Sequence, residues 1–195
     1  MESKISDREL IRGCMDGDNS STEELIRRHK DRVYGYISMY IRDQALAEDI
    51  FQETFLKVIN CLNAGRYRED GKFLSWVMRI AHNLIIDHFR RSKQMGLVSN
   101  DDYETDIFNS RKFSDPNIEE SLVKKQVVSD VRRLIRMLPP DQREVVIMRH
   151  YTGLSFKEIA DITGVSINTA LGRMRYALIN MRKLMEEHKI NLKTA

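Results

Sequence analysis

Cysteine is nearly absent from this sequence of 195 residues, which contains only Cys14 and Cys61. The two lie far apart and form no C-x-x-C pair, so neither a zinc site nor a disulfide framework is predicted. We expect both to be small, buried or half-buried side chains. The five histidines form no H-E-x-x-H pattern, and the chain has neither a G-x-S-x-G motif nor a glycine-rich phosphate loop. The sequence therefore predicts no enzyme and no cofactor.

Long apolar runs are lacking as well. No stretch reaches membrane-spanning length, and the opening MESKISDREL is charged from the start, unlike a secretion signal. We therefore expect a cytoplasmic protein without membrane insertion. A length of 195 residues allows one large or two small domains, and the composition, with 42% hydrophobic and 31% charged residues, is typical of a folded, helix-rich protein. A net charge of +3 permits a nucleic-acid partner without requiring one.

The pattern of residues 154–178 predicts two short helices joined by a tight turn. This segment carries the clearest motif of the chain. Ser155 is expected to cap the first helix, whose Ile159 and Ile162 face inward around the small Ala160. Gly164 supplies the left-handed backbone of the turn, where a Cβ would be strained. This pattern predicts a helix-turn-helix.

The second helix of this motif is predicted to begin after Ser166 and to bury Ala170, Met174 and Leu178, which recur at four-residue spacing. Between Gly164 and Met185 it has basic residues and no acid, so it suits phosphate neutralisation and the major groove. An ordinary helical hairpin is the alternative. The outward residues expected to meet DNA are Ser166, Asn168, Thr169, Gly172, Arg173, Arg175 and Tyr176.

Three amphipathic helices are predicted near the start of the chain, at residues 7–17, 21–42 and 45–61. The third buries Ala47, Ile50, Thr54 and Val58 and turns an acidic face outward. DNA would repel that face, so a functional role requires a basic protein surface, although a merely solvated helix face is the simpler interpretation. Its outward residues are Glu48, Asp49, Gln52, Glu53 and Lys57.

A fourth helix is predicted in GKFLSWVMRIAHNLIIDHFRRSK, with Phe73, Val77, Ile80, Ala81 and Leu84 facing inward. Aromatic residues among basic and amide side chains suit unstacked bases and single-stranded backbone. Core packing is the alternative role for Trp76. The outward candidates are Trp76, Arg79, His82, Asn83, His88, Arg90, Arg91 and Lys93.

The helical pattern breaks down over residues 94–120, where acids dominate without a sustained period, which indicates a flexible acidic linker between two domains. Helix is predicted again over residues 118–137, with Pro139 and Pro140 stopping it. A further helix over residues 140–150 then leads into the helix-turn-helix. The predicted fold class is therefore all-α, with two small helical domains.

Taken together, the segments AEDIFQETFLKV, FLSWVMRIAHNLIIDHFRR and LPPDQREVVIMRHYTGLSFKEIADITGVSINTALGRMRYAL resemble sigma factors of the extracytoplasmic-function group. These are small two-domain subunits that direct bacterial RNA polymerase to promoters. The resemblance covers most of the chain, in the family's order. It implies a region 2 domain at residues 1–93, a linker at 94–120 and a region 4 domain at 121–195.

The resemblance also implies roles for individual residues. Asp49, Gln52 and Glu53 would contact the polymerase clamp. Asn83 would receive a flipped base of the minus-ten element, with Tyr67 on the preceding loop, and the helix-turn-helix would read the minus-thirty-five element. The linker would thread through polymerase channels, which its negative charge suits. The residues implied to hold the minus-ten DNA backbone are Arg79, Arg90 and Arg91.

One departure from the family lies in the recognition helix, where Leu171-Gly172 stands in place of a frequent Lys-Ser pair. The family's base preference is therefore not transferable, and Gly172 costs about 1 kcal/mol relative to Ala, which close approach to DNA would justify. The family commonly has an anti-sigma partner, which the sequence does not identify. A stand-alone helix-turn-helix regulator is the main alternative, and an interaction protein without a DNA role is a third.

Overall fold

The computed structural model describes residues 5–41, 43–94 and 121–190, and every regular element within these ranges is a helix. The chain divides into two compact units, Met1–Val98 and Ser99–Ala195, which we describe separately. The predicted all-α class with two helical units is confirmed. Of the predicted linker, only Gln94 is described, as the last residue of a helix. The predicted start of the next helix at residue 118 also lies outside the described residues.

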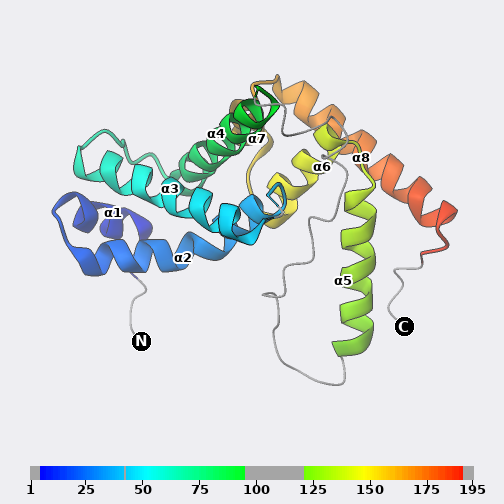
Figure 1. Cartoon of the computed structure of the whole chain (residues 1–195), viewed down its shortest axis with the longest axis horizontal. Coiled ribbons are helices and arrows are strands. Elements are labelled where there is room, and N and C mark those ends of the chain that lie inside the picture. The colour runs from blue at the N-terminus through cyan, green and yellow to red at the C-terminus, as the bar shows by residue number, and fades with distance from the viewer. Residues whose placement is uncertain (1–4, 42, 95–120, 191–195) are drawn as a thin grey trace. The chain divides into compact units, whose positions relative to one another are not determined.

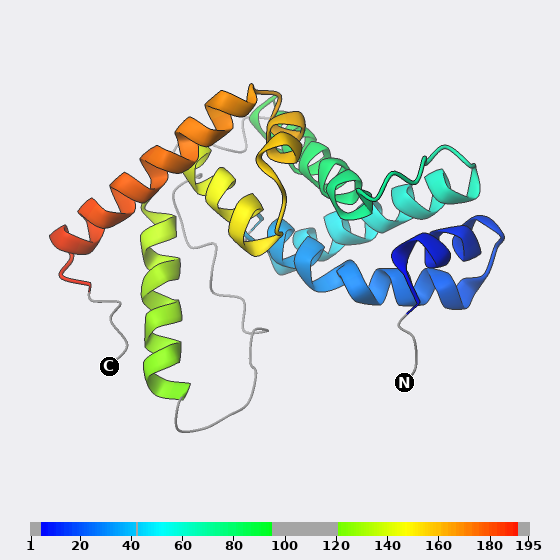
Figure 2. The ribbon, with the colours of Figure 1, turned by 180° about the vertical axis from the view of Figure 1, so that it is seen from behind.

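Among the described residues of the first unit there are four helices, and the second of them packs against each of the other three (Figure 1, Figure 2). The first three helices begin at capped N-termini, where Ser6, Asp18 and Asp43 accept hydrogen bonds from backbone amides of the first turn. Ser6 and Glu9 form a full capping box. The helices are α1 (Asp7–Met15), α2 (Asn19–Ser38), α3 (Gln44–Asn63) and α4 (Phe73–Gln94).

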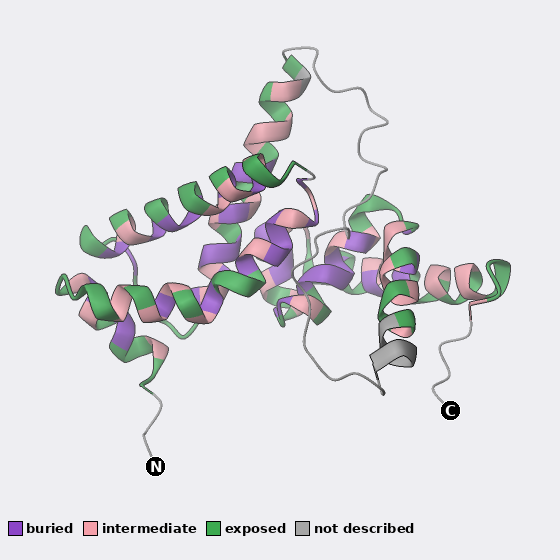
Figure 3. Ribbon diagram, turned by 60° about the horizontal axis from the view of Figure 1, so that its bottom comes forward, coloured by how far each residue is buried: buried purple, intermediate pink, exposed green. Residues whose placement is uncertain are grey.

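The core of the first unit follows the predicted inward stripes, with buried residues on the facing sides of the helices and exposed residues outside (Figure 3). All four predicted inward residues of α3 are buried. On α4, Met78 and Ile85 are buried as well, whereas Ile80 is only half-buried. Because α4 packs against both α2 and α3, its buried face is wider than one stripe.

Partly buried polar contacts join helices within this unit. The Asp7 carboxylate accepts from Arg28 Nη1 at 3.0 Å and lies 2.8 Å from His29 Nε2, which ties the start of α1 to α2. The Tyr36 hydroxyl lies 2.9 Å from His82 Nδ1, which joins α2 to α4. Partly buried polar contacts of this kind fix the relative positions of helices that apolar packing alone would leave adjustable.

The second unit is also helical, and its sharp corner at Pro139-Pro140 is closed by a buried arginine. The guanidinium of Arg143 donates through Nη2 to the carbonyl oxygens of Leu138, at 3.0 Å, and of Arg136. These carbonyls lie at and just beyond the helix end, where intrahelical donors are missing. The elements are α5 (Ser121–Arg136), α6 (Pro140–Val146), η2 (Ile147–Tyr151), α7 (Phe156–Thr163) and α8 (Ile167–Glu187).

The helix predicted over residues 140–150 is not uniform. Its α-helical part ends at Val146, and one wider π-turn, η2, follows. The Thr152 amide donates to the Ile147 carbonyl five residues earlier, and the Thr152 hydroxyl donates to the Met148 carbonyl. Residues 145–148 are all buried. An amphipathic α-helix with a single buried stripe would leave some of four consecutive residues exposed. The π-turn is invisible to a sequence pattern that assumes 3.6 residues per turn.

The predicted helix-turn-helix is confirmed. Ser155 and Glu158 form a capping box at the start of α7, and Ile159, Ala160 and Ile162 are buried. Gly164 ends α7 in the left-handed conformation, with φ of 68°, and the Val165 amide donates to the Ala160 carbonyl. The turn therefore depends on a residue without a Cβ.

One prediction for α8 is wrong. Leu178 was expected to face inward, but its side chain is 44% exposed, and Ala177 is buried in its place beside Ala170 and Met174. At 3.6 residues per turn, a position eight residues after Ala170 lies about 80° away around the helix, whereas a position seven residues on lies only about 20° away. Exact four-residue spacing therefore drifts off the buried face.

A pH dependence of stability follows from two histidines of the first unit. Burial lowers the pKa of His29 and of His82 below the ordinary value of 6.5, and Asp7 only partly offsets this for His29. As pH falls below that value the unfolded chain takes up protons that the folded chain does not, so the free energy of unfolding falls. Urea unfolding at about pH 7.5 and about pH 5.5 should show the loss.

The variant H29Q/H82Q should lose less stability between these two pH values than the natural protein does. The exposed histidines provide the control, because H150Q/H188Q should keep the full loss. An unchanged pH slope in H29Q/H82Q would contradict this account.

Candidate nucleic-acid interface

Within residues 5–41, 43–94 and 121–190, no three His, Cys, Asp or Glu side chains come together as a cation site would need. None of the helices in those ranges has the length and apolarity needed to span a bilayer.

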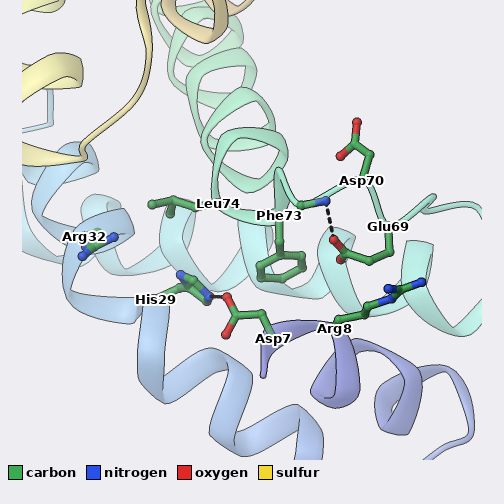
Figure 4. Close-up of a pocket in the computed structure, with 9 residues that line it drawn as sticks. Asp7, Arg8, His29, Arg32, Glu69, Asp70, Phe73 and Leu74 are labelled. Carbon is green, nitrogen blue, oxygen red and sulfur yellow. Dashed lines mark hydrogen bonds and ion pairs between the residues drawn. The ribbon is translucent and has the colours of Figure 1, made fainter. Parts of the chain in front are cut away.

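A hollow of about 530 Å³ lies below the loop between α3 and α4 (Figure 4). It has charges of both signs, and the pair of Asp7 and His29 forms part of its lining. On the loop side, Glu69 accepts a hydrogen bond from the Gly71 amide. The hollow thus shows how the loop leading into α4 folds back toward α1 and α2. Its lining residues are Asp7, Arg8, His29, Arg32, Glu69, Asp70, Gly71, Phe73 and Leu74.

Tyr67 and Trp76, both predicted to face DNA, are brought together on the first unit. Their ring centroids are 4.4 Å apart, and Phe73 packs against the Tyr67 ring nearly edge-on at 5.8 Å. Tyr67 is only 8% exposed, and burial raises the pKa of its hydroxyl. Trp76 remains half-buried. Tyr67 therefore supports the Trp76 ring, which is the more accessible of the two.

Exposed side chains form one outward stripe on α4. Arg79, Asn83, Ile86 and Arg90 recur at spacings of four, three and four residues, and all are exposed. Asn83 lies in the middle of Phe73–Gln94, so it caps neither end of the helix. Arg90 lies 3.6 Å from the Asp87 carboxylate. Ile86 is the one residue of this stripe that the sequence pattern does not identify.

Arg91, also predicted to hold DNA, is exposed but lies about 100° around α4 from Arg90. It is therefore displaced to one side of the stripe that carries Arg79 and Asn83.

The outer face of α3 carries the predicted acidic surface, with Asp49, Gln52 and Glu53 exposed. Glu53 forms an ion pair with Lys57 at 3.0 Å, one turn further on. Leu56 lies on the same face, one turn beyond Gln52 and Glu53, and its side chain is 60% exposed. A sequence pattern that looks for inward apolar residues does not find this leucine, because Leu56 falls outside the inward period.

Two hydroxyls predicted to read DNA are engaged at the start of α8. Ser166 Oγ accepts from the Thr169 amide at 3.0 Å, and the Ser166 and Thr169 hydroxyl oxygens lie 2.9 Å apart. Both residues are exposed, but their hydrogen bonds form the N-terminal cap. Asn168 is exposed between them.

Further along α8 the predicted residues separate into two sets. Arg175 and Tyr176 are exposed on the outward face, with half-buried Gly172 beside them. Arg173 lies on the flank toward α6, where its Nη2 donates to Asp141 Oδ2 at 2.7 Å. The nearby amide of Asn180 donates to Gln142 Oε1 at 2.8 Å, which places a second contact on the same flank.

These features define a helical transcription protein with a helix-turn-helix in one unit and an aromatic, amide-bearing helix in the other. Residues 25–94 match the family described as Sigma-70 region 2, and residues 129–175 match Sigma-70, region 4. The RNA polymerase sigma factor CarQ of Myxococcus xanthus is 32% identical over 178 residues, which cover 91% of this chain and 96% of that protein.

Two further comparisons agree with these matches. The ECF RNA polymerase sigma factor SigW of Bacillus subtilis is 26% identical over 190 residues, covering 96% of this chain and 100% of that protein. The solved structure of the sigma factor RpoE in complex with the anti-sigma factor NepR from Bartonella quintana has the same fold. It matches with a TM-score of 0.62 and 18% identity, over 84% of this chain and 96% of that one. The chain belongs to the extracytoplasmic-function group of RNA polymerase sigma factors.

Proposed function

We propose that this sigma factor divides its work among three helix faces: α3 binds core RNA polymerase, α4 reads the minus-ten element, and α8 reads the minus-thirty-five element. The region 2 role then belongs to residues 1–93 and the region 4 role to residues 121–195. The observation that carries the proposal is the contrast in outward chemistry. The face of α3 holds exposed Asp49 and Glu53, whereas α8 carries four basic residues between Gly164 and Met185 without an acid.

The face of α3 suits a protein partner better than DNA. Its carboxylates would be repelled by phosphates and attracted by a basic protein surface. Leu56 adds an exposed apolar side chain to the same face, one turn beyond Gln52 and Glu53. Protein interfaces commonly combine apolar side chains with polar residues beside them. The polymerase contact therefore consists of these four residues.

Reversing two charges on this face should weaken binding to core polymerase. In D49K/E53K, two attractive contacts become repulsive, and we expect at least a tenfold loss of affinity, about 1.4 kcal/mol. Exposed helix charges cost little stability, so the circular dichroism spectrum should not change. Fluorescence anisotropy of labelled protein titrated with core polymerase measures the affinity.

The control is D16K/E23K, which makes the same net charge change at exposed positions outside α3. It should retain binding to core polymerase. If both double variants bind core polymerase as tightly as the natural protein, the polymerase contact does not involve α3.

The outward stripe of α4 is proposed to read the melted minus-ten segment. Asn83 offers both a donor and an acceptor to the pairing edge of an extruded base, and Arg79 and Arg90 flank it at one and two turns. Trp76, backed by Tyr67, offers a ring on which an unstacked base can rest. Arg91 contributes charge from the side of this stripe.

The variant N83A should lose base preference within the minus-ten segment while keeping its fold. Alanine is the better helix former, so replacing an exposed mid-helix asparagine should leave the thermal midpoint unchanged or slightly higher. Competition among promoters that differ at single minus-ten positions measures the preference. Pre-melted templates should restore activity only in part, because they supply the opening energy and not the base contact.

An exposed asparagine outside α4 supplies the control, since N60A, in the last turn of α3, should keep the full minus-ten preference. Unchanged selectivity in N83A would move the reading pocket toward Trp76 and Tyr67.

The outward face of α8 is proposed to enter the major groove with Asn168, Gly172, Arg175 and Tyr176. Ser166 and Thr169 hold the start of the helix in shape at that position. Arg173 is oriented by Asp141 through one nitrogen, which leaves its other donors for a base edge. A guanidinium held in place loses less conformational entropy when it binds.

Substitutions at Arg173 and Arg182 should have different effects on DNA binding. R173A should relax preference at one or two upstream positions by about 1 to 3 kcal/mol, the size of a bidentate base contact. R182A removes an exposed cation near the far end of α8, so it should weaken all sequences alike and reduce the salt dependence. Quantitative binding to single-position promoter variants at several salt concentrations separates the two. Identical profiles for both variants would mean that Arg173 only tethers α8 to α6.

Two wider roles belong to the same proposal. Sigma factors are initiation factors without enzymatic activity, and we infer that this chain catalyses no reaction and works in the cytoplasm beside its polymerase. An anti-sigma factor is proposed as a regulatory partner, because the similar RpoE is found in complex with one.

A further inference from the structure

Two large apolar side chains are exposed at the beginning of the recognition helix. Ile167 and Leu171 are each 44% exposed, and their four-residue spacing places them on the same flank of α8. Residues near the N-terminus of a recognition helix are those that usually reach base edges. An apolar contact is thus available where hydrogen-bonding side chains would be expected.

The hydrogen-bonding groups around these two residues are largely committed to the protein itself. The Ser166 and Thr169 hydroxyls interact with each other in the helix cap. The Arg173 guanidinium lies on the opposite flank, where one of its nitrogens donates to Asp141. Near Leu171, readout by polar groups is therefore limited to Asn168 and Arg175.

Gly172 has no role in the fold that requires glycine. A Cβ added there would meet no heavy atom within 4 Å, and the residue lies within regular helix. Glycine in a helix interior stabilises the helix less than alanine does. Gly172 therefore lowers the stability of α8, and the packing of the helix gains nothing from the missing side chain. Because Gly172 has no side chain, a ligand that contacts the neighbouring Leu171 can approach the backbone of α8 more closely.

Charge identifies the partner as a polyanion. The same helix carries Arg175, Arg182 and Lys183, all exposed, and has no acid from Ile167 to Met185. A surface that combines cations with an exposed leucine matches the major groove, where phosphates border the groove and thymine projects a C5-methyl group.

We propose that Leu171, with Ile167 beside it, selects thymine in the upstream promoter element through apolar contact with the C5-methyl group. The inference rests on the proposed placement of α8 in the major groove. It assigns to Leu171 a specificity role that hydrogen-bonding side chains perform in many recognition helices. Gly172 is a positioning residue that allows the approach.

Replacing thymine by uracil tests this directly, because the exchange removes only the methyl group. The full chain assembled with core RNA polymerase first selects duplexes from a library randomised in the upstream element. The selected duplex is then remade with deoxyuridine at one thymine at a time, and the affinity of each duplex is measured. One or two positions should lose about three- to fivefold in affinity, as expected for one methyl group removed from an apolar contact.

The variant L171A should bind the thymine duplex more weakly and should no longer distinguish uracil from thymine at those positions. Leu178, with the same 44% exposure two turns further along α8, supplies the matched control. L178A should retain the full discrimination. The variant G172A should also reduce discrimination while raising the thermal midpoint, a combination that a purely structural glycine would not produce.

The proposal would be overturned by selected duplexes without thymine in the upstream element, by equal binding of uracil and thymine at every position, or by full discrimination in L171A. If L171A instead weakens only the assembly with core polymerase, the flank is a protein interface and the proposal is wrong. Failure of the proposed function looks different, since the holoenzyme would then enrich no upstream sequence at all.

Discussion

Each helix of this protein buries a defined face, and this constraint decides which chemistry reaches solvent. Along α3 the inward residues Ala47, Ile50, Thr54 and Val58 turn Asp49 and Glu53 outward. Along α8, burial of Ala170, Met174 and Ala177 turns Arg175 and Tyr176 outward. The same packing rule thus presents an acidic face on one helix and a basic face on another. Opposite charges on separate faces allow one chain to engage a protein and a nucleic acid.

The second determinant is the rigid support given to the side chains that are proposed to act. Trp76 rests against Tyr67 and Phe73, and Arg173 is held by Asp141. The start of α8 is fixed by the Ser166 cap and by the left-handed Gly164 before it. Groups held in place before binding lose less entropy when they bind, so this support favours affinity and selectivity alike.

Much of the fold could be predicted from the sequence, because amphipathic period and capping residues act locally. Ser155, Gly164 and Ser166 marked the helix-turn-helix correctly, and the four residues predicted to face inward on α3 are buried, together with Phe55 and Leu62. The π-turn η2 could not be predicted, since no local signal distinguishes it from α-helix. The error at Leu178 arose from treating four-residue spacing as the true helical period.

The interface was less predictable than the fold, because it depends on contacts between residues far apart in the sequence. The Asp141–Arg173 pair, for example, joins α6 to α8 across 32 positions. Leu56 could not be predicted because it is exposed and does not follow the spacing of the residues that α3 buries. Periodicity finds what a helix buries, whereas the functional surface consists of what it leaves exposed.

Transcription reconstituted from purified components tests the central claim most directly. Core RNA polymerase, with and without the full chain, is incubated with fragments of the source genome, and the 5′ ends of the transcripts are mapped. We expect start sites that appear only with the chain and that share two sequence elements at a constant separation. A chain that binds duplex DNA specifically but adds no start sites would contradict the account and favour a stand-alone helix-turn-helix regulator.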